Sequence, residues 1–347
     1  MSTPTSALVA DRQARSDEIA GAVFTLWIVT GLFVDGWAHN VDKPEDFFTP
    51  WHFILYSGFV ASVLWFSAVG VRRRAAGTAT PPPRLILAGY GLFALGGVAD
   101  GVWHQVFGVE VDIEALLSPT HLLLMTGGLL LTTDAIRSMI ARGERAPTLT
   151  RFLPAIGGLT ATVAVLAFFT QFASAFRVFD HDIFGGFATE QMQVVGLTAV
   201  LLTNALLIGA LTWTARRWET PRGTFTLVFG GVALFMSIES GFDQIWLAGA
   251  AVAGGLAADM MLSRGASLRA TLVVVPAAMW TSWFAIYHAV WGLGWSAELW
   301  TGTVFFAILT GVGLSLLARP STPNDATREP AEDHVKVNFA LQRPDGF

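Results

Sequence analysis

Long apolar stretches separated by short polar segments dominate the chain. Each stretch is about 20 residues long, the length that an α-helix needs to cross the hydrocarbon core of a bilayer. Because backbone polar groups find no water inside a bilayer, such stretches are expected to be helical. The pattern predicts an all-α, polytopic membrane protein with about ten transmembrane helices. The predicted helices cover residues 19–40, 50–71, 84–106, 119–141, 152–175, 188–215, 223–243, 245–262, 268–290 and 297–317.

Basic residues are distributed unevenly between the two sets of segments that connect these helices. One set contains Arg72, Arg73, Arg74, Arg137, Arg142, Arg145, Arg151, Arg216, Arg217, Arg222, Arg264, Arg269 and Arg319. The opposite set contains only Lys43 and Arg177. The positive-inside rule places the basic set in the cytoplasm. We therefore expect a multi-pass protein of the cell membrane with both termini cytoplasmic.

Four regions follow from this pattern. Residues 1–18 are polar and are expected to form a cytoplasmic N-terminal segment. Residues 19–141 contain the first four helices, and residues 142–317 form a second helical half, interpreted as a scaffold or a substrate path. Residues 318–347 are polar and contain proline, which predicts a disordered cytoplasmic tail. At 53% hydrophobic and 14% charged residues, the composition agrees with a membrane protein.

The first four predicted helices contain two copies of one polar pattern. Each copy reads Asp-Gly-x-x-His and then, after a loop, Ser/Thr-Pro-x-His. The copies consist of Asp35, His39, Thr49 and His52, and of Asp100, His104, Ser118 and His121. The two aspartates lie 65 residues apart, and the two last histidines lie 69 residues apart. Matching polar residues in apolar surroundings indicate an internal repeat of a helical hairpin.

The spacing within each copy brings the ligand types of a metal site together. The aspartate and the first histidine are four residues apart and share one helix face. Thr49 and Ser118 are predicted N-caps, each followed by proline at the first helical position. The last histidine then lies in the first turn of the returning helix, level with the end of the preceding one. Each hairpin offers one carboxylate and two imidazoles, which suit copper, zinc or non-haem iron. The predicted metal ligands are Asp35, His39, His52, Asp100, His104 and His121.

Two assemblies of these six residues are open. Each hairpin could hold its own metal, or both could form one dinuclear site with ions about 3.5–4 Å apart. In the alternative interpretation, each Asp–His pair is a polar clasp between helices. Ionisable residues at membrane depth are costly, which favours a functional role. The chain has no cysteine, so thiolate ligands and disulfides are excluded.

Further acidic residues lie on the same side of the predicted membrane. Glu110, Asp112 and Glu114, in the loop between the third and fourth helices, are candidates to support the metal ligands or to line a substrate pocket, but we interpret them as solvated loop acids rather than ligands. Glu239 and Asp243 repeat the four-residue spacing in the seventh predicted helix. They could be ligands, a proton relay or a helix-end pair, and we take them as the candidate catalytic residues.

The first motif, from Asp35 to His52, has the spacing Asp-x3-His-x12-His. This resembles the copper site of the C subunit in the copper membrane monooxygenases, the particulate methane and ammonia monooxygenase family. That subunit also carries an Asn-x3-His…His site in a later hairpin. The second motif, from Asp100 to His121, is similar to it, with Asp for Asn and a longer loop. The resemblance covers residues 35–121 and implies copper as the metal and partner membrane subunits.

The chain also departs from that family. The family subunit is shorter, has fewer helices and works beside two partner subunits. Nothing in this sequence resembles the soluble copper domain of the family's B subunit. The resemblance therefore implies a copper site more directly than it implies hydrocarbon oxidation.

Three classes of function remain. The preferred one is a copper-dependent oxidase or monooxygenase-like protein acting on a small or lipophilic substrate. The alternative is transport or handling of copper or zinc, which would favour polar residues along a path through the membrane. The cytoplasmic helix halves are apolar apart from Asp134 and Asp259, which argues against such a path. Binding of b-type haem by pairs of histidines is the third. The expected partners are the lipid bilayer, a second copy or partner membrane subunits, and no nucleic acid.

Overall fold

The computed structural model describes residues 4–41, 49–78, 83–108, 110, 112–178 and 181–317. All regular secondary structure within these residues is helical. The α-helices are α1 (Pro4–Asn40), α2 (Pro50–Ala75), α3 (Arg84–Phe107), α4 (Asp112–Leu117), α5 (Pro119–Thr132), α6 (Asp134–Arg142), α7 (Leu149–Phe169), α8 (His181–Phe184), α9 (Glu190–Arg217), α10 (Thr224–Ile238), α11 (Ala248–Ser263), α12 (Leu268–Trp291) and α13 (Ala297–Leu317). Two short 3-10 helices are η1 (Gln171–Ala173) and η2 (Ile245–Leu247).

Nine helical stretches in the described part of the chain are long and apolar enough to cross a membrane. The chain is therefore a multi-pass membrane protein. Each of the ten predicted helices has a counterpart in the predicted order, but the one predicted at 223–243 is only the 15-residue α10. The helix predicted at 119–141 is divided at Thr133 into α5 and α6.

The two segments predicted at the ends of the chain compare differently with the structure. The polar segment predicted at 1–18 is not separate from the first helix, because α1 begins at Pro4. Its polar part forms ion pairs with later helices: Asp17 pairs with Arg72 and Arg73 of α2, and Glu18 pairs with Arg142 of α6. The tail predicted at 318–347 lies outside the described residues.

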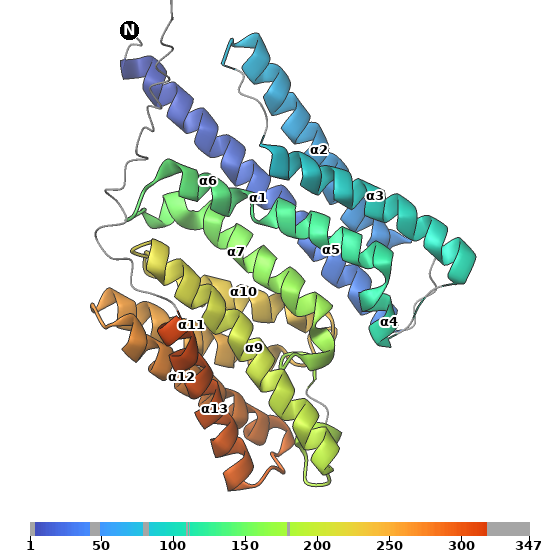
Figure 1. Cartoon of the computed structure of the whole chain (residues 1–347), viewed down its shortest axis with the longest axis vertical. Coiled ribbons are helices and arrows are strands. Elements are labelled where there is room, and N and C mark those ends of the chain that lie inside the picture. The colour runs from blue at the N-terminus through green and yellow to red at the C-terminus, as the bar shows by residue number, and fades with distance from the viewer. Residues whose placement is uncertain are drawn as a thin grey trace, which may run out of the picture.

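The first half of the chain consists of two helical hairpins. α1 packs along α2, and α3 packs along α5 (Figure 1). Glycine permits the close approach in each hairpin. A Cβ at Gly31 of α1 would lie 2.5 Å from the Leu55 backbone of α2, and one at Gly127 of α5 would lie 2.6 Å from the Phe93 backbone of α3. Glycine thus lets the two helices of each hairpin pack closely.

α7 connects these hairpins to the second half. It contacts α1, α5 and α6 on one side and α9 and α10 on the other, and most of its side chains are buried. A small apolar cluster of Ile28, Leu55, Ile86 and Leu131 joins the two hairpins. The larger core extends from α7 through α9–α13. This packing holds the ends of α1 and α3, which carry the predicted ligands, against a rigid bundle.

Candidate metal centre

The first three-residue group lies where α1 ends and α2 begins. His52 Nε2 lies 3.0 Å from Asp35 Oδ1, and His39 Nε2 lies 3.8 Å from Asp35 Oδ2. Asp35 and His39 are on successive turns of α1, as their spacing predicts. Thr49 occupies the predicted N-cap position with Pro50 next to it, but its hydroxyl contacts His52 Nδ1 at 2.8 Å and does not cap the helix. We call Asp35, His39 and His52 the first triad.

The second group repeats this arrangement at the end of α3 and the start of α5. His104 Nε2 lies 3.2 Å from Asp100 Oδ2, and His121 Nε2 lies 3.4 Å from Asp100 Oδ1. The Thr120 hydroxyl donates to Asp100 Oδ1 at 2.7 Å. Ser118 is the N-cap of α5, and its Oγ accepts from the backbone N–H of His121 at 3.3 Å, as predicted. We call Asp100, His104 and His121 the second triad.

In the second triad, the ring nitrogen of each histidine that does not face Asp100 is held by a neighbour. His121 Nδ1 contacts the Ala115 carbonyl oxygen. His104 Nδ1 lies 3.2 Å from the Gly108 carbonyl oxygen and 3.3 Å from Glu110 Oε2. Metal-bound histidines characteristically donate the second ring N–H to a carbonyl or carboxylate in this way, which fixes the ring and directs the other nitrogen to the metal.

The distances within each triad suit a bound ion. Ligand atoms at about 2.0–2.2 Å from a tetrahedral metal lie about 3.3 Å from one another. The nitrogen–oxygen distances of 3.2 and 3.4 Å in the second triad match this separation, and the 3.0 and 3.8 Å of the first triad bracket it. In each triad one donor atom from each residue lies within 4.8 Å of the others.

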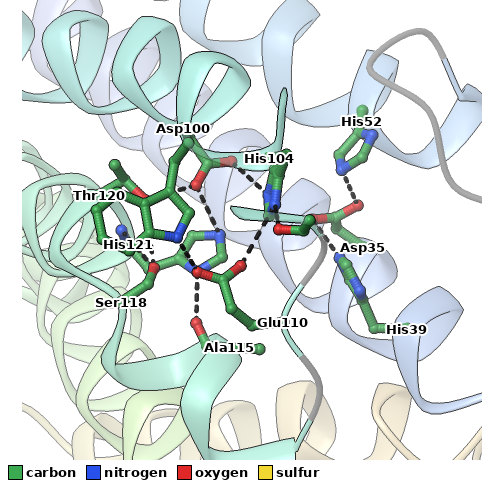
Figure 2. A network of polar contacts seen from close by, with 12 residues as sticks. Asp35, His39, His52, Asp100, His104, Glu110, Ala115, Ser118, Thr120 and His121 are labelled. Carbon is green, nitrogen blue, oxygen red and sulfur yellow. Dashed lines mark hydrogen bonds and ion pairs between the residues drawn. The ribbon is translucent and has the colours of Figure 1, made fainter. Parts of the chain in front are cut away.

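The two triads lie beside each other, with Asp35 of the first near His104 of the second (Figure 2). His39 is within electrostatic range of His104 and His121. In the described residues, the donor atoms nevertheless form two separate groups of three rather than one group of six. The geometry therefore favours two neighbouring sites, one in each hairpin, over one shared cluster.

Glu110 takes the less favoured of the roles that the sequence left open. A solvated loop acid was preferred over a group that supports the site, but the Glu110 side chain is only 14% exposed and lies against the second triad. Besides His104, it accepts a hydrogen bond from the indole of Trp103. Its position near His104 was a weak sequence signal, since the chain between α3 and α4 must turn back across the end of α3.

Glu239 and Asp243 do not share a helix face, so the prediction of an i, i+4 pair in a helix is wrong. α10 ends at Ile238, because Gly241 adopts a left-handed conformation with φ of 59° and closes the helix end. Asp243 is exposed in the turn that follows. Glu239 is 1% exposed and reaches the end of α1, where its carboxylate accepts from the Asn40 amide at 2.8 Å.

The helices that carry the triads line an apolar cavity together with α7. Its lining includes residues of α1, α2, α3, α5 and α7. Leu32, Leu55 and Leu124 each lie three residues from a triad residue on their own helix, and Phe93 lies seven residues from Asp100. Such spacings put them on the helix faces that carry the triads. The cavity thus lies about one helix turn from the triads, along the same helices.

Comparisons of the chain with protein-family models, with curated proteins and with solved structures found no match.

Proposed function

We propose that the chain is an integral membrane metalloprotein that binds one transition-metal ion in each triad. Copper is the proposed metal, before zinc or iron, and oxidase- or monooxygenase-type chemistry on a small or lipophilic molecule is the proposed activity. Metal transport or handling and haem binding are the competing functions that the experiment below separates.

The proton positions in the second triad carry this proposal. A carbonyl oxygen can only accept a hydrogen bond, so the Nδ1 of His121 that contacts Ala115 must carry a proton. In a neutral imidazole, Nε2 then carries no proton and can only accept. It faces the Asp100 carboxylate, which is also an acceptor. His104 is in the same position, with the Gly108 carbonyl at Nδ1 and Asp100 at Nε2.

Two acceptors that face each other need a cation between them. A second proton on each ring would place two imidazolium rings, with centroids 6.0 Å apart, beside the carboxylates of Asp100 and Glu110. One metal ion would instead satisfy both Nε2 atoms and the Asp100 carboxylate at once. This supports a metal site over a polar clasp, in which each histidine would donate its Nε2 proton to aspartate.

The ligand set favours copper. Each triad supplies two imidazole nitrogens and one carboxylate, and affinity for such divalent sites is greatest for Cu²⁺ among the first-row metals. The resemblance of the first motif to the copper membrane monooxygenases supports the same metal. In this proposal copper, when bound, supplies one-electron redox chemistry.

The surroundings of the triads favour an enzyme over a transporter. An ion crossing the membrane would need polar groups beyond the triads, whereas the adjoining cavity is apolar. A small lipophilic molecule dissolved in the bilayer could use such a cavity to reach the triads. The distribution of arginines supports cytoplasmic termini, and with them triads at the extracytoplasmic face of the cell membrane.

Elemental analysis of detergent-purified protein, with absorption and electron paramagnetic resonance spectra, tests this proposal. We expect one copper ion per triad in the wild type and loss of both in a His39→Ala/His104→Ala variant. His288→Ala is the matched control, because His288 lies on α12 and only accepts from the Leu293 backbone N–H at 3.3 Å. A Soret band in the absorption spectrum would identify the bound cofactor as haem and not copper. Protein that binds no metal even after titration would refute the proposal and leave the triads as clasps.

A further inference from the structure

The turn between α10 and η2 is strained and tightly packed against α1. Phe242 has a φ of 69°, a conformation that is costly for a bulky side chain and that concentrates at functional sites. A Cβ at Gly241 would lie 3.2 Å from the Trp37 indole nitrogen of α1. The fold therefore holds an unfavourable turn in place directly beside the end of α1.

This turn buries polar atoms that have no protein partner among the described residues. Glu239 and Gln244 are each 1% exposed. Glu239 Oε1 and both amide atoms of Gln244 are buried without a hydrogen bond, and so is the Nε of nearby Arg177. Buried polar groups of native proteins are almost always paired, with protein or with ordered water. Together these groups offer the donors and acceptors that a few water molecules need.

The same buried carboxylate touches the helix turn that carries the first triad. Glu239 Oε2 and its backbone oxygen accept from the Asn40 amide, next to His39. Glu239 Oε1 lies so close to Gly36, next to Asp35, that a Cβ there would be 2.6 Å from it. Glu239 therefore lies between the buried polar turn and the backbone of the first triad.

From this arrangement we propose that Glu239, Gln244 and Arg177 line a hydrated chamber that exchanges protons between bulk water and the first triad. Glu239 releases its proton to a water on the triad side and regains one from water on the Arg177 side, so that no net charge is left behind. The use of these protons at a metal bound in the first triad rests on the proposed function. The existence of the chamber does not depend on that function.

The charges around Glu239 suit this role. Arg177, in the turn after η1, favours the ionised carboxylate, and Asp35 of α1 opposes it. From α7, the apolar Phe168 packs against Gly36, the same glycine that Glu239 contacts. Asp243 of the same turn is exposed. Glu239 thus experiences one cation that favours its ionised form and one anion that favours its protonated form.

Infrared difference spectroscopy on the metal-free protein tests the chamber. The carbonyl band that is present in wild type and absent in Glu239→Gln reports protonated Glu239. We expect this band to shift within seconds of transfer to D₂O and to vanish as the pH rises. Gln244→Leu, which removes polar partners of the chamber water, should slow the exchange at least tenfold. Asp243→Asn, an exposed neighbour, is the matched control and should leave it unchanged.

The connection to the first triad is tested in the same metal-free samples. Asp35→Asn removes the anion that opposes ionisation, so the Glu239 band should vanish at a lower pH than in wild type. Asp100→Asn, in the second triad, should leave the midpoint unchanged. The inference would be overturned, whether or not the protein binds copper, by either of two results. The Glu239 band does not shift in D₂O, or its pH midpoint is the same in Asp35→Asn as in wild type. A protein that binds no copper but shows both effects would refute the metal proposal and keep the chamber.

Discussion

Glu110 offers the sharpest test of the second triad, because it contacts His104 without belonging to the three proposed ligands. Its Oε2 lies 3.3 Å from His104 Nδ1, and its Oε1 accepts from the Trp103 indole. Replacement by glutamine keeps the size of the side chain but leaves one carbonyl oxygen for two donors and removes the negative charge. His104 then loses part of the support that orients its Nε2 toward the metal.

Substitution of such supporting groups typically weakens metal binding 10–100-fold, which corresponds to about 1.4–2.7 kcal/mol of binding free energy. We expect a loss in this range for Glu110→Gln, confined to one of two ions, because the Nδ1 of His104 keeps the Gly108 carbonyl at 3.2 Å. Competition titration with a chelator of known copper affinity measures both binding steps on one sample.

The control for this experiment is Glu114→Gln, which changes an exposed acid on neighbouring α4 and should leave both affinities unchanged. Unaltered copper affinity in Glu110→Gln would show that Glu110 does not support His104. Equal weakening of both ions would contradict two separate sites and indicate one shared centre.

Three further predictions concern stability. Gly36→Ala should lower the free energy of unfolding by about 1–3 kcal/mol in a denaturant titration, because the added Cβ would lie 2.6 Å from both Glu239 and Phe168. The control, Gly70→Ala, has open space around the added Cβ and should be neutral or stabilising in the same titration. Burial raises the pKa of Glu239 to about 8, although Arg177 and Asn40 lower it. The contribution of Glu239 to stability is therefore full below its ordinary pKa and is lost as the pH rises through 8. The thermal unfolding temperature of the wild type should decline between about pH 5 and 9, whereas that of Glu239→Gln should lack this decline. Equal pH slopes in the two proteins would contradict the buried carboxyl. Asp259→Ala should lower the unfolding free energy by about 1–2 kcal/mol, since Asp259 accepts from the first backbone N–H groups of α10 at 3.1 and 2.9 Å; an unchanged midpoint would show that this cap is dispensable.

The helical order and the two triads were predictable because their signals are local. Apolar length identifies a spanning helix, and the four-residue spacing of Asp35 and His39 places both on one face whatever the rest of the fold does. The Ser118-Pro pair likewise fixes the start of α5, and with it the level of His121. These features depend on neighbours within a few residues, which the sequence displays directly.

The parts that were missed depend on tertiary packing or on a turn signal that was overlooked. Glu110 lies on the second triad because of how the chain folds back after α3, and no periodic pattern reports such a path. The end of α10 was signalled by Gly241, a residue type that commonly closes helices, but the apolar stretch was extended past it. The contact between Glu239 and Asn40 joins residues 199 positions apart, far beyond any local pattern.

The first hairpin is fastened at both ends. Asp17 near the start of the apolar part of α1 pairs with Arg72 and Arg73 of α2, and Asp35 near its end pairs with His52 at the start of α2. The two aspartates are 18 positions apart, which spans about 27 Å of helix, close to the thickness of a hydrocarbon core of about 30 Å. Because these ties keep α1 and α2 from sliding past each other, the pair offers the bilayer one fixed apolar length. A bilayer of different thickness must then thin or thicken around the pair, or the pair must tilt.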